Sequence, residues 1–208
     1  MFTRTALTLV AAAALAAVGA PAALAEEVSC TGSLGATAVD NLRVPANASC
    51  SLAGTTLQGT IVVQGGATLT ADNITVIGNI QAENARSVTV TGSRVGGSIQ
   101  LGQGGGAVIR TTQINADLQF SQMTAPLTAD RNTVGGSIQA FTNIGGLTIV
   151  ANRVNGNLQC KENNPAPTGG GNVVQGNKED QCADGVLTPA ASAPTPVPGG
   201  PPPSQPPV

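Results

Sequence analysis

The chain has 208 residues and a formal charge of −2, and it contains no His, Tyr or Trp. Without His there can be no Ser/His/Asp or Cys/His catalytic unit and no His-ligated metal, and without Tyr or Trp there is no aromatic platform for sugars or single-stranded bases. Charged residues make up 10% of the chain, too few for the basic surface that nucleic-acid binding requires.

Residues 1–25 have the pattern of a secretory signal peptide. Arg4 precedes an apolar stretch from Ala6 to Val18, and a small-x-small sequence ends at Ala25. This positive, apolar, small-residue order predicts export with cleavage after Ala25. Because the apolar stretch is short for a bilayer span, we expect a secreted, extracellular protein with no membrane span after cleavage.

Residues 26–185 are predicted to form one domain built from an internal repeat. Segments that end in Ile-Gln or Leu-Gln recur along the chain, and their Gln residues are 19, 19, 20 and 20 residues apart. We call these residues the Gln column: Gln81, Gln100, Gln119, Gln139 and Gln159. The same period extends upstream to Arg43 and Val62 and downstream to Gln181, which gives about eight passes. A period near 20 residues held this long predicts a solenoid.

Two further columns hold only Val, Ile or Leu. They are Leu57, Val76, Val95, Ile114, Val134, Val154 and Val174, and Leu42, Ile61, Ile80, Ile99, Leu118, Ile138 and Leu158. Polar residues or Gly separate them, and another apolar pair includes Leu69-x-Ala71 and Val88-x-Val90. Because β-branched residues in alternation are typical of strands, these columns predict short strands that share one core.

The predicted fold is all-β, a single-domain parallel β-helix with about 20 residues, three short strands and three turns per coil. Uneven spacing within each coil favours the right-handed form over a left-handed hexapeptide helix. α-Helices are disfavoured because no segment after the signal peptide has apolar residues at intervals of three and four. A β-sandwich is disfavoured because the sequence repeats column by column, whereas a sandwich would need the turn signals of β-hairpins.

A glycine column lies between the two apolar columns. Its members are Gly59, Gly78, Gly97, Ala116, Gly136, Gly156 and Gly176. We expect a strand corner here, with a backbone conformation or a close approach between coils that a Cβ atom would obstruct.

The four cysteines follow the same period at the two ends of the repeat. Cys160 and Cys182 each follow a Gln, which predicts a shared inward column on adjacent coils, and Cys30 and Cys50 are 20 residues apart. Stacked strands lie about 4.8 Å apart, within the Cα separations that a disulfide tolerates. We therefore predict the disulfides Cys30–Cys50 and Cys160–Cys182, one at each end of the solenoid. A cysteine metal site is disfavoured because CxxC spacing and His are absent.

The polar columns admit a structural and a binding interpretation. The Gln column is predicted to face outward as a strip whose stacked amides hydrogen-bond to one another, and the alternative is a flat strip that binds a glycan or peptide. Asn132, Asn152 and Asn172 predict an internal ladder at a turn, where Asn tolerates left-handed conformations and caps backbone groups.

The acidic residues lack the pattern of a β-helix polysaccharide lyase or hydrolase. Such enzymes place carboxylates on adjacent coils, whereas no two acids of neighbouring coils share a column here. Arg110 and Asp130 share a column, which predicts an exposed ion pair. The run of Glu179, Asp180 and Asp184 is predicted to be a solvated cap rather than a calcium site. We predict no catalytic residue, metal or cofactor.

Residues 186–208 contain nine prolines and no charged side chain. Proline rings and missing N–H groups predict a disordered tail that is partly polyproline II. We interpret it as a solvated spacer, with contact to the cell wall as the alternative.

Motifs at both ends and in the coils carry a resemblance to known proteins. They are Cys30-Thr-Gly-x-Leu34, the Val-x-Gly-[Asn/Ser]-[Ile/Leu]-Gln coils, and Gly156-Asn-Leu-Gln-Cys160 followed by Gln181-Cys182. The chain resembles small, exported, uncharacterised actinobacterial-type β-helix proteins, which implies fold and export and no particular activity. It is more distantly similar to bactofilins and to pectin-lyase-like β-helices. Bactofilins polymerise end to end in the cytoplasm, whereas the export signal and terminal cysteine pairs here depart from that pattern.

These features favour a non-enzymatic, secreted or cell-surface β-helical protein with a structural or binding role. The expected partner is a cell-wall polymer or another surface protein, and the expected oligomeric state is a monomer. The alternative is a carbohydrate-active β-helix enzyme. Phe120 lies in an inward column and only Phe141 can face outward, which weakens sugar binding and favours a structural or protein-contact role.

Overall fold

The computed structural model describes residues 26–184 and residue 187. The predicted signal peptide and all but one residue of the predicted tail lie outside this range. Within the described residues the chain contains no helix, and its strands form three parallel sheets of nine, eight and eight strands. We name them sheets A, B and C in the order in which each coil passes through them.

The strands of each sheet are one coil apart along the chain. Sheet A holds β1 (Glu27–Ser29), β4 (Asn41–Val44), β7 (Ile61–Val63), β10 (Ile80–Glu83), β13 (Ile99–Gly102), β16 (Leu118–Ser121), β19 (Ile138–Phe141), β22 (Leu158–Lys161) and β25 (Lys178–Asp180). Sheet B holds β2 (Ser33–Leu34), β5 (Ser49–Ala53), β8 (Thr68–Asp72), β11 (Ser87–Thr91), β14 (Gly106–Arg110), β17 (Leu127–Asp130), β20 (Leu147–Val150) and β23 (Thr168–Gly170). Sheet C holds β3 (Ala38–Val39), β6 (Thr56–Leu57), β9 (Thr75–Val76), β12 (Arg94–Val95), β15 (Gln113–Ile114), β18 (Thr133–Val134), β21 (Arg153–Val154) and β24 (Val173–Val174).

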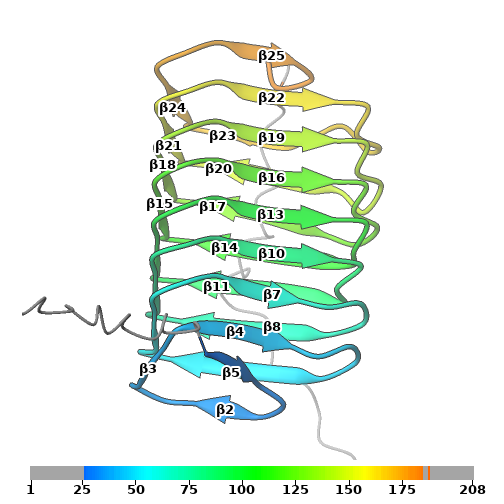
Figure 1. Cartoon of the computed structure of the whole chain (residues 1–208). Coiled ribbons are helices and arrows are strands. Elements are labelled where there is room, and N and C mark those ends of the chain that lie inside the picture. Colours follow the sequence, from blue (N-terminus) through cyan, green and yellow to red (C-terminus); the bar gives the residue numbers. More distant parts are fainter. Residues whose placement is uncertain (1–25, 185–186, 188–208) are drawn as a thin grey trace, which may run out of the picture.

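The three sheets form the walls of a solenoid, which confirms the predicted parallel β-helix. In Figure 1 the strands of sheet A face the viewer and point to the right while the chain climbs from blue to orange, so the coils wind in the right-handed sense. Sheet B runs behind in the opposite direction, and the two-residue strands of sheet C close the side between them.

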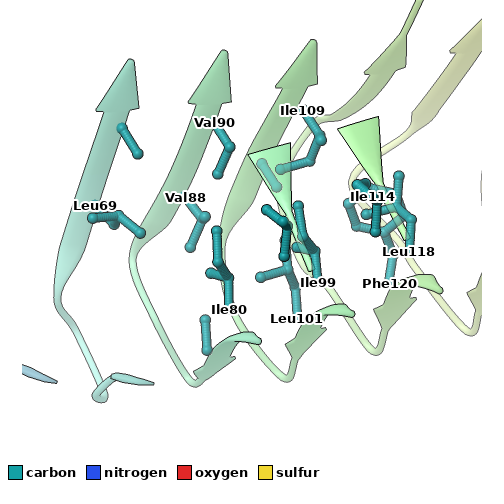
Figure 2. Packing of buried hydrophobic residues seen from close by; sticks show 14 of the residues in the cluster. Leu69, Ile80, Val88, Val90, Ile99, Leu101, Ile109, Ile114, Leu118 and Phe120 are labelled. Atoms are coloured by element: carbon teal, nitrogen blue, oxygen red, sulfur yellow. The ribbon is translucent and has the colours of Figure 1, made fainter. Parts of the chain in front are cut away.

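The core is a stack of equivalent aliphatic side chains inside the solenoid. All seven members of the predicted Leu42–Leu158 column have an exposed fraction of 0%, and they pair in register along sheet A. Figure 2 shows Ile80, Ile99 and Leu118 of this column side by side on successive coils, facing Val90 and Ile109 from sheet B. Because each coil encloses a space only a few side chains wide, medium-sized aliphatic residues fill it and Phe120 is the largest fully buried side chain.

The corner between sheets C and A is held by a column of small polar residues that the sequence analysis missed. Its members are Asn41, Thr60, Asn79, Ser98, Asp117, Ser137, Asn157 and Asn177. From Thr60 onward, the backbone N–H of each donates to the side-chain oxygen of the member one coil earlier, at N···O distances of 2.7–3.2 Å. These bonds satisfy corner N–H groups that point out of the sheet ladders.

This polar column explains the glycine column beside it. A Cβ atom at Gly97 would overlap the carboxamide oxygen of Asn79, and one at Gly136 would overlap Asp117. Close approach is therefore the cause, since no member of the column has a left-handed φ. Ala116 faces the shorter Ser98, and its backbone N lies 3.2 Å from the Gly97 carbonyl oxygen, against 2.7–3.0 Å at the other members, so a small backbone shift makes room for its Cβ atom.

The other two corners contain buried asparagine ladders. At the corner from sheet B to sheet C, the predicted ladder is present: the backbone N–H of Asn132 and of Asn152 donates to the Oδ1 of the next Asn, at 2.9 Å in both cases. The left-handed residues are Arg131 and Ala151, with φ of 54° and 55°, so the prediction that the Asn residues themselves take this conformation is wrong. They follow it, which turns their side chains inward.

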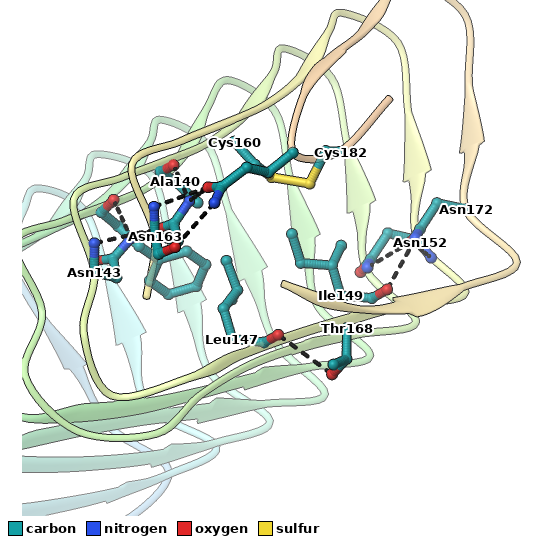
Figure 3. The surroundings of a disulfide bond; sticks show 12 residues. Ala140, Asn143, Leu147, Ile149, Asn152, Cys160, Asn163, Thr168, Asn172 and Cys182 are labelled. Carbon is teal, nitrogen blue, oxygen red and sulfur yellow. Dashed lines mark hydrogen bonds between the residues drawn. A yellow bond between two sulfur atoms is a disulfide. The ribbon is translucent and has the colours of Figure 1, made fainter. Parts of the chain in front are cut away.

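A second ladder, at the corner from sheet A to sheet B, was not predicted. The backbone N–H of Asn143 donates to Asn163 Oδ1 at 3.1 Å, and that of Asn163 donates to Gln181 Oε1 at 2.8 Å (Figure 3). The side chains of Asn143 and Asn163 also donate to the carbonyl oxygens of Phe120 and Ala140. A constant period does not predict this column, because its spacing changes from 20 residues to 18.

Both predicted disulfides are present, with Cα separations of 5.5 Å for Cys30–Cys50 and 5.2 Å for Cys160–Cys182. The register predicted for them is wrong. Cys160 lies opposite Asp180 rather than Cys182 in the sheet, because Asp180 already has the left-handed φ of the corner, at 53°. The corner therefore comes two residues earlier than in the preceding coil, where Glu162 takes the left-handed φ, and Cys182 reaches Cys160 from beyond it.

The N-terminal pair has a similar offset. Ser33 pairs with Ser51, so that Gly32 rather than Cys30 precedes Cys50 in its column. Cys30 follows β1 of sheet A, and Cys50 lies in β5 of sheet B. Each disulfide thus joins a terminal coil to its neighbour near the corner between these two sheets.

We predict that Gly97→Ala destabilises the fold far more than Gly156→Ala. The new methyl group at position 97 overlaps Asn79 and breaks its bond to the Ser98 N–H, a cost of about 3 kcal/mol. At position 156 the methyl group would lie 2.5 Å from Ser137 Oγ and 2.8 Å from the Gly136 carbonyl oxygen, so the backbone must shift slightly, as it does at Ala116 beside Ser98, and the expected cost is about 1 kcal/mol. Urea unfolding measures both; equal losses would contradict the role of the polar column.

We predict that replacing Cys160 and Cys182 by Ser loosens one end of the solenoid. Closing a loop of this size contributes about 3 kcal/mol, and a terminal coil has a neighbour on one side only. Native-state hydrogen exchange should become faster in β22 and β25 while the amides of β10 and β13 keep their protection. The matched Cys30→Ser and Cys50→Ser variant should show the same effect at β1. Uniform acceleration in all coils would contradict local stapling.

Candidate functional site

The Gln column forms a continuous ladder on the outer face of sheet A, as the structural interpretation predicted. The Nε2 atom of each Gln donates to the Oε1 atom of the Gln in the next coil, at 3.2, 3.4, 2.9 and 3.0 Å from the first pair to the last. The last amide, Gln159, donates to Glu179 Oε2 at 2.8 Å. The predicted continuation to Gln181 is wrong, because Gln159 pairs with Glu179 in the sheet and Gln181 turns into the asparagine ladder.

The Gln ladder has a direction and two different ends. Every amide donates toward the C-terminal coil, where the Glu179 carboxylate accepts the last bond. At the other end the preceding residue in the column is Val62, which has no polar side chain. Among the described residues, no group donates to Gln81 Oε1, and this acceptor remains open to a ligand or to water.

A shallow groove of about 670 Å³ lies at this N-terminal end of the ladder. Gln81, Gln100 and Gln119 form one side of it, and the next outward column contributes Glu83, Gly102 and Ser121. The groove exists because Gly102 has no side chain and Ser121 has a short one, between the longer Glu83 and Phe141 of the same column. Exposed Val62 adds an apolar contact surface.

Glu83 is the charged group of the groove. Its side chain extends over Gly102, where a Cβ atom would lie 2.5 Å from Glu83 Oε2. Among the described residues no ion pair involves Glu83, which is exposed. Arg43, two coils earlier, contacts Glu27 at 2.7 Å, and the Nε of Arg86 donates to the carbonyl oxygen of Gly66. The groove therefore offers hydrogen-bonding amides with one uncompensated negative charge.

Other acidic residues lie away from the groove. The predicted pair of Arg110 and Asp130 is present at 3.7 Å, but Arg131 makes the closer contact, at 2.8 Å. Only 11% of the Asp130 side chain is exposed, so the prediction of an exposed pair is wrong for this partner. Both Arg side chains and the adjacent corner cover it.

The corner at Asp180 separates the acidic residues of the last coil, with Glu179 before it and Asp184 after it. Lys178 Nζ contacts Asp184 at 2.6 Å, whereas Glu179 ends the Gln ladder. Within the described part of the chain, no group of three or more Cys, Asp or Glu residues is arranged to hold a metal ion. No helix among those residues is long and apolar enough to cross a membrane.

Phe120 is fully buried, as the sequence predicts. Phe141 stands on the outer face of sheet A opposite Ser121 and Lys161 and is half-buried. It lies beyond the groove along the same column, so the groove itself offers no aromatic surface.

Comparisons of the chain with protein-family models, with curated proteins and with solved structures give no match. The resemblance drawn from the terminal motifs is therefore supported at the level of a parallel β-helix alone, which the three stacked sheets establish.

We predict that Gln119→Ala and Asn152→Ala differ strongly in their effect on stability. Gln119 is half-exposed and water can replace its two amide bonds, so the expected cost is below about 1 kcal/mol. Asn152 is fully buried, and its loss leaves the buried Asn132 N–H without a partner and removes the bond to the Ala129 carbonyl, at a cost of about 3 kcal/mol. Urea midpoints at a constant m-value measure both; a costly Gln119→Ala would contradict a solvated outer ladder.

Proposed function

We propose that this protein is a non-enzymatic, exported β-helical rod that acts at the cell surface or in the medium by binding a cell-wall polymer through sheet A. The observation that carries the proposal is the groove at the open end of the Gln ladder, where amide groups and one carboxylate face outward from a rigid wall. Rigidity comes from hydrogen-bonded columns at all three corners, and preorganised groups lose little freedom when a ligand binds.

Export is supported by two features. Residues 1–25 carry the signal-peptide pattern, and the two disulfides stabilise the fold only in an oxidising compartment. Terminal disulfides at the first and last coils suit a monomer whose ends are not continued by a second copy. The proposed relationship to actinobacterial-type exported proteins is consistent with the same terminal cysteine motifs.

Binding is favoured over catalysis by the composition of the groove. Glycoside hydrolysis requires two carboxyl groups on either side of the scissile bond. Of the described residues that line the groove, Glu83 is the sole acid, and its neighbours are amides, Gly and Ser. These groups can hold a hydroxyl-rich polymer by hydrogen bonds without a partner acid or base for bond cleavage.

We predict that the mature chain, incubated with pectin, alginate and isolated peptidoglycan, produces neither reducing ends nor unsaturated products, and that it sediments with insoluble cell walls. Sedimentation should be weakened by Gly102→Thr, which fills the groove, and unchanged by Thr148→Val on the outer face of sheet B. Removing residues 186–208 tests whether the tail contributes. New reducing ends would favour the alternative, a carbohydrate-active enzyme, and sedimentation unaffected by Gly102→Thr would place binding on another face.

A further inference from the structure

We propose that the groove on sheet A selects a ligand that carries a primary ammonium group on an otherwise neutral sugar chain, that is, a partly deacetylated amino-sugar polymer. This inference rests on the proposed function and specifies its ligand. It is argued from the charge of the groove, the direction of the Gln ladder and the position of the groove on the sheet.

The first argument is charge. Glu83 is exposed and takes no part in the described ion pairs, and its carboxylate extends over the space left by Gly102. Arg43, two coils earlier, is paired with Glu27 at 2.7 Å, and none of the described salt bridges includes Glu83. A ligand ammonium placed beside this carboxylate would supply the missing positive charge and a charge-assisted hydrogen bond.

The second argument is hydrogen-bond polarity. Gln81 begins the ladder, and its Nε2 donates to Gln100 while its Oε1 has no donor among the described residues. Glu83 and Gln81 therefore present acceptors to the same end of the groove. An ammonium group has three donors and no acceptor, which matches this end better than a carboxylate or phosphate would.

The third argument is the neutrality of the remaining lining. Gln100, Gln119 and Ser121 carry amide and hydroxyl groups, and Val62 offers an apolar surface. A polymer with many charges would meet one opposite charge and then only neutral groups. A sugar chain with hydroxyl groups and an occasional free amine fits this distribution, whereas a polyanion such as pectate would be repelled by Glu83.

The fourth argument separates a sugar from a peptide strand. A peptide commonly binds a β-protein by adding a strand to an exposed edge, where backbone groups are free. The groove lies on the face of β10, β13 and β16, which are paired with neighbours on both sides. Binding here must use side chains alone, which suits hydroxyl and amine groups spaced along a sugar chain.

The experiment compares a glucosamine hexamer with its fully N-acetylated counterpart by isothermal titration of the mature chain. We expect the wild type to bind the amine form about ten-fold more tightly, as one charge-assisted hydrogen bond allows. This preference should weaken as salt increases. In Glu83→Gln the preference should disappear while the N-acetylated form binds as before.

Two further variants keep the result interpretable. Glu162→Gln removes the same charge outside the groove, at a corner where Gln103 and Gln122 already take the same left-handed φ, and should retain the preference. Gly102→Thr displaces Glu83 and fills the groove within a strand that favours Thr, and it should abolish binding of both hexamers without lowering stability.

The outcomes separate this inference from the proposed function. Equal binding of both hexamers, or a preference that survives Glu83→Gln, overturns the ammonium inference and leaves a binding rod. A trilysine peptide that binds as tightly as the glucosamine hexamer and depends equally on Glu83 overturns the assignment to a sugar. Failure of both hexamers to bind, together with failure to sediment with cell walls, overturns the proposed function itself.

Discussion

Backbone N–H groups at the corners of each coil impose the constraint on which this structure depends. Within the sheets these groups bond to the next coil, but at the three bends they point away from the ladders and would be left without partners in a narrow solenoid. Polar side chains accept them in successive coils at the bend from sheet C to sheet A and in several coils at each of the other two bends. The aliphatic core and the glycine column both follow, because side chains that turn inward at the corners leave little space beside them.

Stacking of equivalent residues then accounts for the shape of the surface. Each outward column presents one residue per coil at the strand spacing, so that amides such as Gln100 and Gln119 lie within bonding distance of one another. A single glycine in an outward column, Gly102, is enough to create a groove, because its neighbours stay at fixed positions. In such a fold a single substitution in an outward column can change binding while the core stays unchanged.

The repeat allowed much of the fold and part of the candidate site to be predicted. The inward columns, the outer Gln ladder and the ladder at Asn132, Asn152 and Asn172 follow from a constant period, since each position repeats the environment of the one before. The terminal register did not follow. There Asp180 lies opposite Cys160 at the usual spacing of 20 residues, and the corner that follows comes two residues early, which brings Gln181 into the ladder of Asn143 and Asn163. The corner column from Asn41 to Asn177 was not predicted, because its positions hold different residue types rather than one.

The sequence by itself determined the class of fold and the inward and outward sense of its columns, because a periodic chain repeats one set of local interactions. It also indicated the pairing of the cysteines, because each pair lies about one coil apart, although not in one column. Only the tertiary structure decided where Glu83 lies relative to Gly102, that Gln81 begins a ladder with an open acceptor, and that Arg43 and Arg86 are engaged elsewhere. These features depend on side-chain directions and on contacts between residues in different coils, which a column of letters does not specify. The groove and its charge therefore emerge from the fold.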